Sequence, residues 1–373
     1  MFTRRIHILL GAVVALPLCV QAFTGALLVF EREIDTWLNA RYFYVDPVGE
    51  PLSLQQQFDS LCTVYPDMRP HVYAVGLPIA PDQATTMLAK PNEEVGPRRG
   101  VRFFVNPYTG EVTGNQPYHS TLMGKVYNLH RTFWLPRWGK WITSTSALLT
   151  ATLVITGYLL HWVTRRQADT KSRGPLLRLH RRVGKYFGPL VFVIALNGAA
   201  VTYMFLVVIF VYWASGTEMP KEMREGRSTQ ITEAPGSTRY TLDELIARAN
   251  LDYPEAQPRL LLQPGRPDTA VTVILKKPHE PRDIGGTFVS MDPTTGEPIG
   301  LTDFTDGELG NRAVYWIIHS HKGTWGGYLA GSVGKQATRV LWIVTALAAT
   351  MLAATAAVSF ARRARSPASE PTE

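Results

Sequence analysis

Long apolar stretches alternate with long polar segments along this chain, and the alternation predicts its architecture. A helix needs about 20 apolar residues to cross the roughly 30 Å hydrocarbon core of a bilayer. Four stretches exceed that length and carry almost no charge, so we expect four transmembrane helices. The apolar stretches occupy residues 6–30, 141–163, 186–213 and 340–361, and polar segments rich in Pro, Gly and charge occupy 41–135 and 216–330.

The first apolar stretch resembles a secretory signal because Arg4 and Arg5 precede it. Its apolar run is longer than the usual 7–15 residues, and it ends in charged residues at 31–33 without a small-residue cleavage site. We therefore expect a retained membrane helix.

Basic residues predict the orientation of the helices. They gather before the first stretch, between the second and third, and after the fourth, so four crossings bring all three clusters to one side. Both termini are then expected in the cytoplasm and both polar domains outside a bacterial inner membrane. This topology accounts for the net charge of +8 without a nucleic acid partner. The basic clusters are Arg4 and Arg5; Arg165, Arg166, Lys171, Arg173, Arg178, Arg181, Arg182 and Lys185; and Arg362, Arg363 and Arg365.

Matched motifs indicate an internal repeat. His180, Gly184 and Gly198 follow His7, Gly11 and Gly25 by 173 residues each. In both polar segments a Ser/Thr-x-x-Gln/Glu capping box opens a helix, at 53–56 and 241–244. An Asn/Asp-Pro turn with a later glycine then follows a β-rich run, at 106–111 and 292–297. Each outer domain is therefore expected to be one helix packed on a small antiparallel sheet.

The predicted fold is a membrane α-helical bundle of four transmembrane helices with two α+β extracytoplasmic domains, formed by a parallel duplication. Its expected divisions are helix 1 at 1–33, the first outer domain at 34–127, a short outer helix plus helix 2 at 128–164, a basic cytoplasmic loop at 165–183, helix 3 at 184–214, the second outer domain at 215–315, an outer segment plus helix 4 at 316–361, and a cytoplasmic tail at 362–373.

Four of the nine histidines occupy matched positions in the two copies. His7 and His180 are expected at the cytoplasmic ends of helices 1 and 3, and His130 and His319 just outside the membrane ahead of helices 2 and 4. Two histidines at each face suit bis-histidine ligation of haem iron in an apolar helix bundle. The plain alternative for any one of them is an interfacial or exposed polar residue.

Other residues compete for these roles or support them. His161 ends helix 2 and is an alternative ligand at the cytoplasmic side, while His321 is an alternative outside. Gly11 and Gly184 lie one helical turn from His7 and His180, on the same face, where a missing side chain leaves room for a flat macrocycle. Close contact between helices is the alternative explanation of these two glycines, and it is compatible with the first.

The two cysteines narrow the choice of cofactor. Cys19 lies within the first apolar stretch and Cys62 in the first polar segment, and neither belongs to a CxxC or CxxCH motif. This argues against structural zinc, an iron–sulfur cluster and covalently attached haem.

The motifs resemble those of the PepSY-associated transmembrane helix proteins. The resemblance is carried by Arg4-Arg5-Ile6-His7 with Gly11, by Leu179-His180 with Gly184, and by the Asp-Pro-Thr-Thr-Gly-Glu turn at 292–297. It implies PepSY outer domains and an iron-regulated inner-membrane reductase of ferric siderophores. It also implies two b-type haems, with His7, His130, His180 and His319 at the positions of the family's motif histidines.

The expected partners are a periplasmic ferric siderophore, membrane lipid, and an electron donor that is either a quinol or a cytoplasmic reductase. No dinucleotide motif follows a strand, and the cytoplasmic loop is too short for a flavin domain. Two alternatives stay open: a PepSY binding protein without redox chemistry, and a component of a siderophore transporter.

Overall fold

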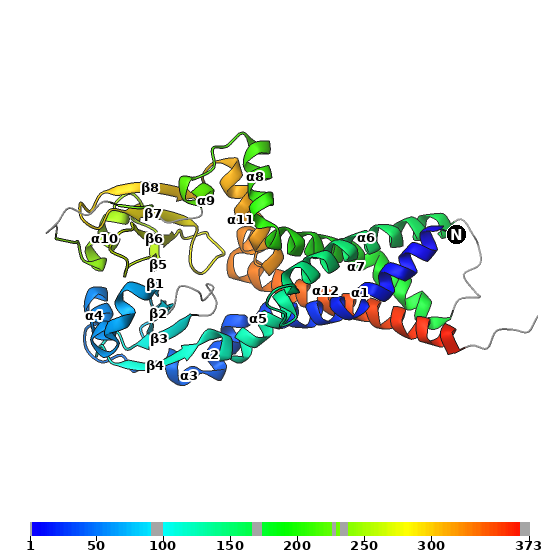
Figure 1. Ribbon diagram of the computed structural model, residues 1–373, viewed down its shortest axis with the longest axis horizontal. Helices are drawn as coiled ribbons and strands as arrows, with labels where there is room; N and C mark the ends of the chain where they lie inside the picture. Colours follow the sequence, from blue (N-terminus) through cyan, green and yellow to red (C-terminus); the bar gives the residue numbers. More distant parts are fainter. Residues whose placement is uncertain (1, 91–99, 166–173, 226–228, 232–237, 366–373) are drawn as a thin grey trace, which may run out of the picture.

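The computed structural model describes residues 2–90, 100–165, 174–225, 229–231 and 238–365. The chain forms a long helical bundle that carries, at one end, a head built around a β-sheet (Figure 1). The N-terminus and the end of the last helix lie at the other end of the bundle, which we call the terminal end. The end that joins the sheet is called the head end.

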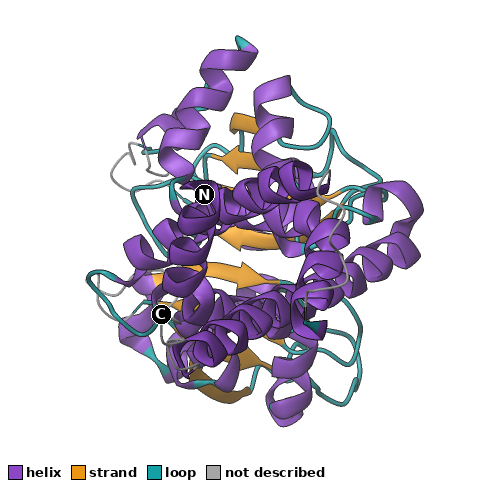
Figure 2. Ribbon diagram, turned by 90° about the vertical axis from the view of Figure 1, so that its right-hand side faces the viewer, coloured by secondary structure: helices purple, strands orange, loops and turns teal. Residues whose placement is uncertain are grey.

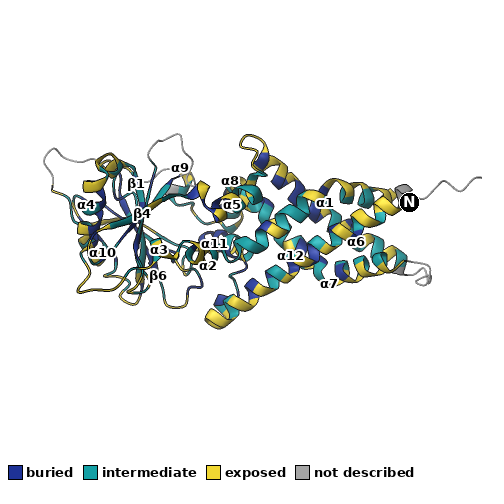
Figure 3. Ribbon diagram, turned by 90° about the horizontal axis from the view of Figure 1, so that it is seen from below, coloured by how far each residue is buried: buried dark blue, intermediate teal, exposed yellow. Residues whose placement is uncertain are grey.

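Four long helices make the bundle, as the apolar pattern predicts, and each is long and apolar enough to cross a membrane. α1 and α7 each pack against both α6 and α12, so α1 and α7 lie opposite one another. Exposed residues alternate with buried ones along the outer surface (Figure 3), and many of the exposed ones are apolar, as lipid contact requires. The helices are α1 (Phe2–Leu28), α6 (Gly139–Arg165), α7 (Pro175–Thr202) and α12 (Gly327–Arg365), the last interrupted by non-helical backbone at Ala330 and Gly331.

The third apolar stretch is divided, which corrects the single helix expected at 184–214. α7 ends at Thr202, and a separate helix, α8 (Met204–Ser215), turns away from the bundle. The uncharged segment 186–217 would be about 48 Å long as one helix, which is more than a bilayer core accommodates without strong tilt. α7 also begins earlier than expected, with Pro175 in its first turn, so the expected basic loop at 165–183 is partly helical.

The rest of that loop and most of the predicted tail, at 166–173 and 366–373, lie outside the described residues.

The head contains one continuous antiparallel sheet of eight strands in the order β4-β3-β2-β1-β5-β6-β7-β8. This corrects the expectation of two separate small sheets, because β1 and β5 pair where the halves meet, with Val75 opposite Leu261. In the view along the bundle (Figure 2) the strands run across the axis behind the helices. The strands are β1 (Val72–Gly76), β2 (Thr85–Ala89), β3 (Val101–Val105), β4 (Val112–Pro117), β5 (Gln257–Leu262), β6 (Val271–Lys276), β7 (Thr287–Met291) and β8 (Pro298–Asp303).

Local signals explain where these elements begin and turn. Both predicted capping boxes are confirmed: Ser53 opens α4 (Leu54–Val64) and Thr241 opens α10 (Leu242–Ala249). Both predicted turns are confirmed as well, since Gly110 and Gly296 adopt positive φ angles between the last two strands of each half.

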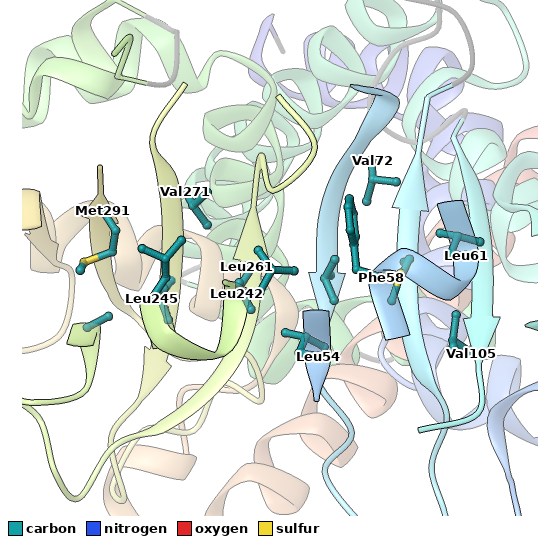
Figure 4. Close-up of a cluster of buried hydrophobic side chains, with 14 of the residues drawn as sticks. Leu54, Phe58, Leu61, Val72, Val105, Leu242, Leu245, Leu261, Val271 and Met291 are labelled. Atoms are coloured by element: carbon teal, nitrogen blue, oxygen red, sulfur yellow. The ribbon is translucent and has the colours of Figure 1, made fainter. Parts of the chain in front are cut away.

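Helices α4 and α10 lie on the sheet face that points away from the bundle (Figure 1). Their apolar sides and the sheet form one core that includes Phe58, Leu61, Leu245 and Leu261, shared by both halves (Figure 4). The Asp243 carboxylate also accepts hydrogen bonds from the first two backbone N–H groups of α4, at 2.8 and 2.9 Å. The halves of the head therefore form one body.

Short helices connect this head to the bundle. α5 packs against α1 and α6, while α11 packs against α7 and α8. The ion pairs Asp35–Arg102 and Asp283–Lys335 join the two parts at 2.7 and 2.8 Å. The remaining elements are α2 (Glu31–Leu38), α3 (Ala40–Phe43), α5 (Leu122–Thr132), α9 (Lys221–Glu225), α11 (Leu309–Lys322), and 3-10 turns at Pro66–His71 and Tyr118–Ser120.

Candidate functional site: two histidine pairs in the bundle

Two of the predicted histidines face one another at the terminal end of the bundle. His7 comes from α1 and His180 from α7, which lie on opposite sides of the bundle. Their ring centres are 6.4 Å apart and the ring planes are nearly perpendicular, at 82°. His161, the alternative for this end, lies on α6 one turn beyond Gly157 and is not the partner of either ring in the described part of the chain.

A second pair lies at the head end and joins His130 of α5 to His321 of α11. Their ring centres are 6.3 Å apart, with 43° between the ring planes. Burial, together with the nearby His321 ring, lowers the pKa of His130 to about 4. The His130 ring is therefore neutral at pH 7, the form in which imidazole binds a metal.

The ring that faces His130 is thus that of His321, and not that of His319 as the sequence analysis predicts. Residues two apart on a helix differ by about 200° in direction, so only one of these histidines can face His130. The buried His319 ring instead packs against Tyr315 at a tilt of 45°, with 4.1 Å between centres, and its Nδ1 atom hydrogen-bonds the Thr324 hydroxyl at 2.7 Å.

Three of the four paired histidines have the same kind of hydrogen-bond partner: each bonds its own threonine on a neighbouring helix. The Nδ1 atoms of His7, His180 and His130 each lie 3.0 Å from a threonine Oγ1. Each of these hydroxyls donates to a carbonyl of its own helix, so its oxygen is left to accept from the imidazole. The threonines are, in the same order, Thr156, Thr355 and Thr24.

The carbonyl three residues before each threonine adds a second acceptor. His180 and His130 lie 3.2 and 3.1 Å from the carbonyls of Leu352 and Gln21, and the Leu153 carbonyl faces His7 in the same way. With the proton held on Nδ1, the lone pair is on Nε2, the atom left for a metal.

His321 departs from this arrangement. Its Nδ1 atom is buried and has no hydrogen bond of ordinary geometry, although the carbonyl of Ile194 faces it. Asn197 takes the place of the threonine, and its side-chain amide donates to the Ser320 hydroxyl at 2.9 Å.

Glycines let three of the histidines approach the neighbouring helix. A Cβ atom on Gly157, Gly25 or Gly198 would lie 3.1–3.2 Å from the Cε1 atom of the facing histidine, which is tighter than most real contacts. We call the threonine or asparagine beside each paired histidine its cradle residue. In three of the four spanning helices a glycine directly follows the cradle residue, and in the fourth an alanine does. The pairs are Thr24-Gly25, Thr156-Gly157, Asn197-Gly198 and Thr355-Ala356. The repeat in the sequence includes Gly25 and Gly198, but neither the pair in α6 nor the pair in α12.

Gly11 and Gly184 have a different environment. A Cβ atom on either would make ordinary contact with a leucine of the adjacent spanning helix, Leu153 at 3.9 Å or Leu352 at 3.7 Å. Both glycines therefore line close contacts between helices, at the level of the carbonyls that face His7 and His180.

The geometry of the pairs fits an iron porphyrin better than a bare metal ion. If two imidazoles bind one metal from opposite sides at about 2 Å, and each nitrogen is about 1.1 Å from its ring centre, the ring centres lie about 6 Å apart. Both pairs have this spacing. Within the described residues no three His, Cys, Asp or Glu side chains gather as a bare ion would require. A porphyrin supplies the remaining ligands itself.

The two pairs are separated by most of the bundle. His7 and Gly25, which contacts His130, lie on the same helix and are about 27 Å apart at 1.5 Å per residue. That distance is close to the thickness of a bilayer core.

These features define an integral membrane protein whose four-helix bundle carries facing histidines at each end and an α+β head. The chain belongs to the PepSY-associated TM region family, whose model matches residues 4–363. The family expected from the sequence motifs is therefore confirmed. No curated protein is recognisably similar in sequence.

Proposed function

We propose that the protein is a di-haem reductase of the bacterial inner membrane, which passes electrons outward to a ferric siderophore in the periplasm. The proposal depends on one observation above the others: two histidine pairs, at opposite ends of a membrane-spanning bundle, have the spacing of axial ligands on one metal. A b-type haem bound at each pair would supply one-electron transfer.

The chain's own residues position these sites. His7 with His180, and His130 with His321, would hold the haem iron, and threonines and carbonyls hold the rings of His7, His180 and His130 in the tautomer that offers Nε2.

The distribution of basic residues supports an orientation with the head in the periplasm. Arg4, Arg5, Arg178, Arg182 and Lys185 all lie at the terminal ends of their helices, which the positive-inside rule assigns to the cytoplasm. The two matching helix-and-four-strand units of the head are then PepSY modules outside the membrane, and they result from a parallel duplication.

The substrate is Fe(III) bound by a siderophore, and one electron reduces it to Fe(II). Fe(II) binds hard oxygen ligands less tightly, so reduction favours release of the iron. Electrons would enter at the terminal end from a quinol or a cytoplasmic reductase. No acid, base or nucleophile is needed for this chemistry, and we assign no catalytic residue beyond the haem ligands.

Haem quantification on the purified protein tests the proposal. Protein produced with ample haem supply should carry about two b-type haems per chain, and His7→Ala should leave about one. Reduced protein mixed with a ferric siderophore and an Fe(II) trap should then be reoxidised as Fe(II) accumulates. Intact protein without a Soret band would refute the haem sites. Protein with haem that never reduces the siderophore would refute the substrate but leave the electron route.

A further inference from the structure

Helix α8 is an apolar element that neither spans the membrane nor belongs to the head sheet. Its 12 residues would extend about 18 Å, too short to cross a bilayer core. It contains no charged residue, unlike α2, the helix that follows α1 at the corresponding place in the first half. Its amino-acid pattern is apolar on every side, so only the structure distinguishes its faces.

One face of α8 packs against the head side of the molecule. Val208 and Tyr212 are buried there against Val314 of α11, with Met219 and Met223 beside them. The Tyr212 hydroxyl also donates a hydrogen bond to the Asn311 amide oxygen. α8 therefore supports the helix that carries His321.

The opposite face of α8 is exposed and entirely apolar. Its exposed residues recur at the spacing of one helix side, and the outermost of them, Trp213, is 77% exposed. A soluble protein would leave such a contiguous surface exposed only at great cost. The residues of this face are Phe205, Leu206, Ile209, Phe210 and Trp213.

The start of α8 lies at the aromatic boundary of the bundle. Tyr203, which separates α7 from α8, contacts the ring of Trp141 near the start of α6, with 5.8 Å between centres. Trp134 and Trp138 are exposed just before that helix. Tryptophans and tyrosines gather where hydrocarbon meets headgroups. From this level α8 runs across the bundle axis (Figure 1).

We propose that α8 lies in the membrane interface next to the head, with its exposed face in the lipid of that leaflet. We infer lipid contact because exposed apolar residues run from the end of α7, at Val201, onto α8 at Phe205 and Leu206, beside the Tyr203–Trp141 contact. α8 then anchors α11, and through it His321, to the bilayer surface. This placement does not depend on haem or on any substrate.

Site-directed spin labelling tests the placement in the full chain. Cys19 and Cys62 are first replaced by alanine, and one cysteine is then introduced at Phe205 or at Phe210. Leu16 on the outer surface of α1 is the lipid-facing control, and Leu251 in the head, also exposed and apolar, is the aqueous control. In phospholipid nanodiscs, the ratio of collisions with oxygen to collisions with a nickel chelate is measured for each label.

The α8 labels should have a collision ratio several-fold above that of Leu251 and below that of Leu16, which lies near the middle of α1 and therefore deeper in the bilayer. Labels that match Leu251 would overturn the proposal. So would labels shielded from both reagents and broadened by a second label, because a second copy of the chain would then cover the face.

A second measurement requires no introduced cysteine. Lipids brominated on their acyl chains should quench a fluorescence component that is present in the natural protein and missing in Trp213→Phe. If that component is not quenched, α8 is not in lipid. Variants that fail to assemble therefore do not leave the proposal undecided.

Discussion

The first and second halves of the chain each hold their own two histidines, and a histidine pair forms only where the halves meet. Thr156 and Thr24 hold His7 and His130 within the first half, while Thr355 holds His180 within the second. Each pair then takes one ring from each half. The two proposed ligand pairs therefore depend on how the halves dock, and a change within one half affects one histidine of each pair.

The halves differ at one cradle position. Asn197 stands where the other three cradles have threonine, and its amide is engaged by Ser320 instead of His321. In the terminal pair both histidines thus have a threonine hydroxyl partner, whereas in the head-end pair only His130 has one. A hydrogen bond to Nδ1–H makes an imidazole a stronger donor, so haems bound at the two pairs, as proposed, would differ in reduction potential.

Among the changes that test the difference between the two pairs, removing His321 should have the largest effect. His321→Ala leaves His130 without an opposing ring, and the haem content should fall from about two to about one per chain. The terminal pair is unaffected, since no residue of it changes. The measurement is haem quantification together with the reduced-minus-oxidised spectrum.

His319→Ala is the matched control, because it removes a buried histidine two residues away on the same helix. It should keep about two haems per chain. If His319→Ala loses a haem and His321→Ala does not, the head-end ligand assigned here is wrong.

The sequence alone could not determine whether His319 or His321 faces His130. The spacing between matched residues changes along the chain: it is 173 for His7 and His180, 186 for Gly110 and Gly296, and 199 for Thr156 and Thr355. The segments between matched residues therefore differ in length in the two halves. A constant offset therefore cannot choose between residues 319 and 321, whereas contact with the Asn197-Gly198 pair does.

Local signals predicted much of the fold, and tertiary contacts determined the rest. Capping boxes and positive-φ glycines act within a few residues, so they could be read directly. The pairing of β1 with β5 joins strands that lie far apart in the sequence, and no short motif specifies it. The end of α7 at Thr202 depends likewise on the packing of Val208 and Tyr212 against α11.

Each half also has an ion pair between the head and the bundle side of the molecule, and the two pairs differ in how far the aspartate is buried. Arg102 pairs with Asp35, whose side chain is only 6% exposed, whereas the side chain of Asp283 beside Lys335 is 48% exposed. Arg102→Ala leaves a buried carboxylate unpaired and should destabilise the head by about 3 kcal/mol. Lys335→Ala should cost under about 1 kcal/mol, because water and Arg32 still solvate Asp283.

Denaturant unfolding of both variants in the same detergent measures this difference. A loss of stability for Lys335→Ala equal to that for Arg102→Ala would contradict it.

Acid should weaken the ion pair between Asp283 and Lys335. Burial tends to raise the pKa of the Asp283 carboxyl, but Lys335 and Arg32 outweigh burial and hold it below its usual value. The pair's contribution is then complete above about pH 4 and is lost as the pH falls toward the lowered pKa.

Asn197→Thr should produce the smallest effect and the most specific one. A threonine hydroxyl at this position would accept from the Nδ1–H of His321, strengthen that ligand toward oxidised iron, and lower the potential of the head-end haem. A tenfold change in relative affinity corresponds to about 60 mV for one electron. Thr24→Val removes the hydroxyl beside His130 and should raise the same potential, while Ser320→Ala, which frees the Asn197 amide without adding a hydroxyl, should change it little. Redox titration resolves the two haems, and a shift confined to the terminal-end haem would show that Asn197 does not act on His321.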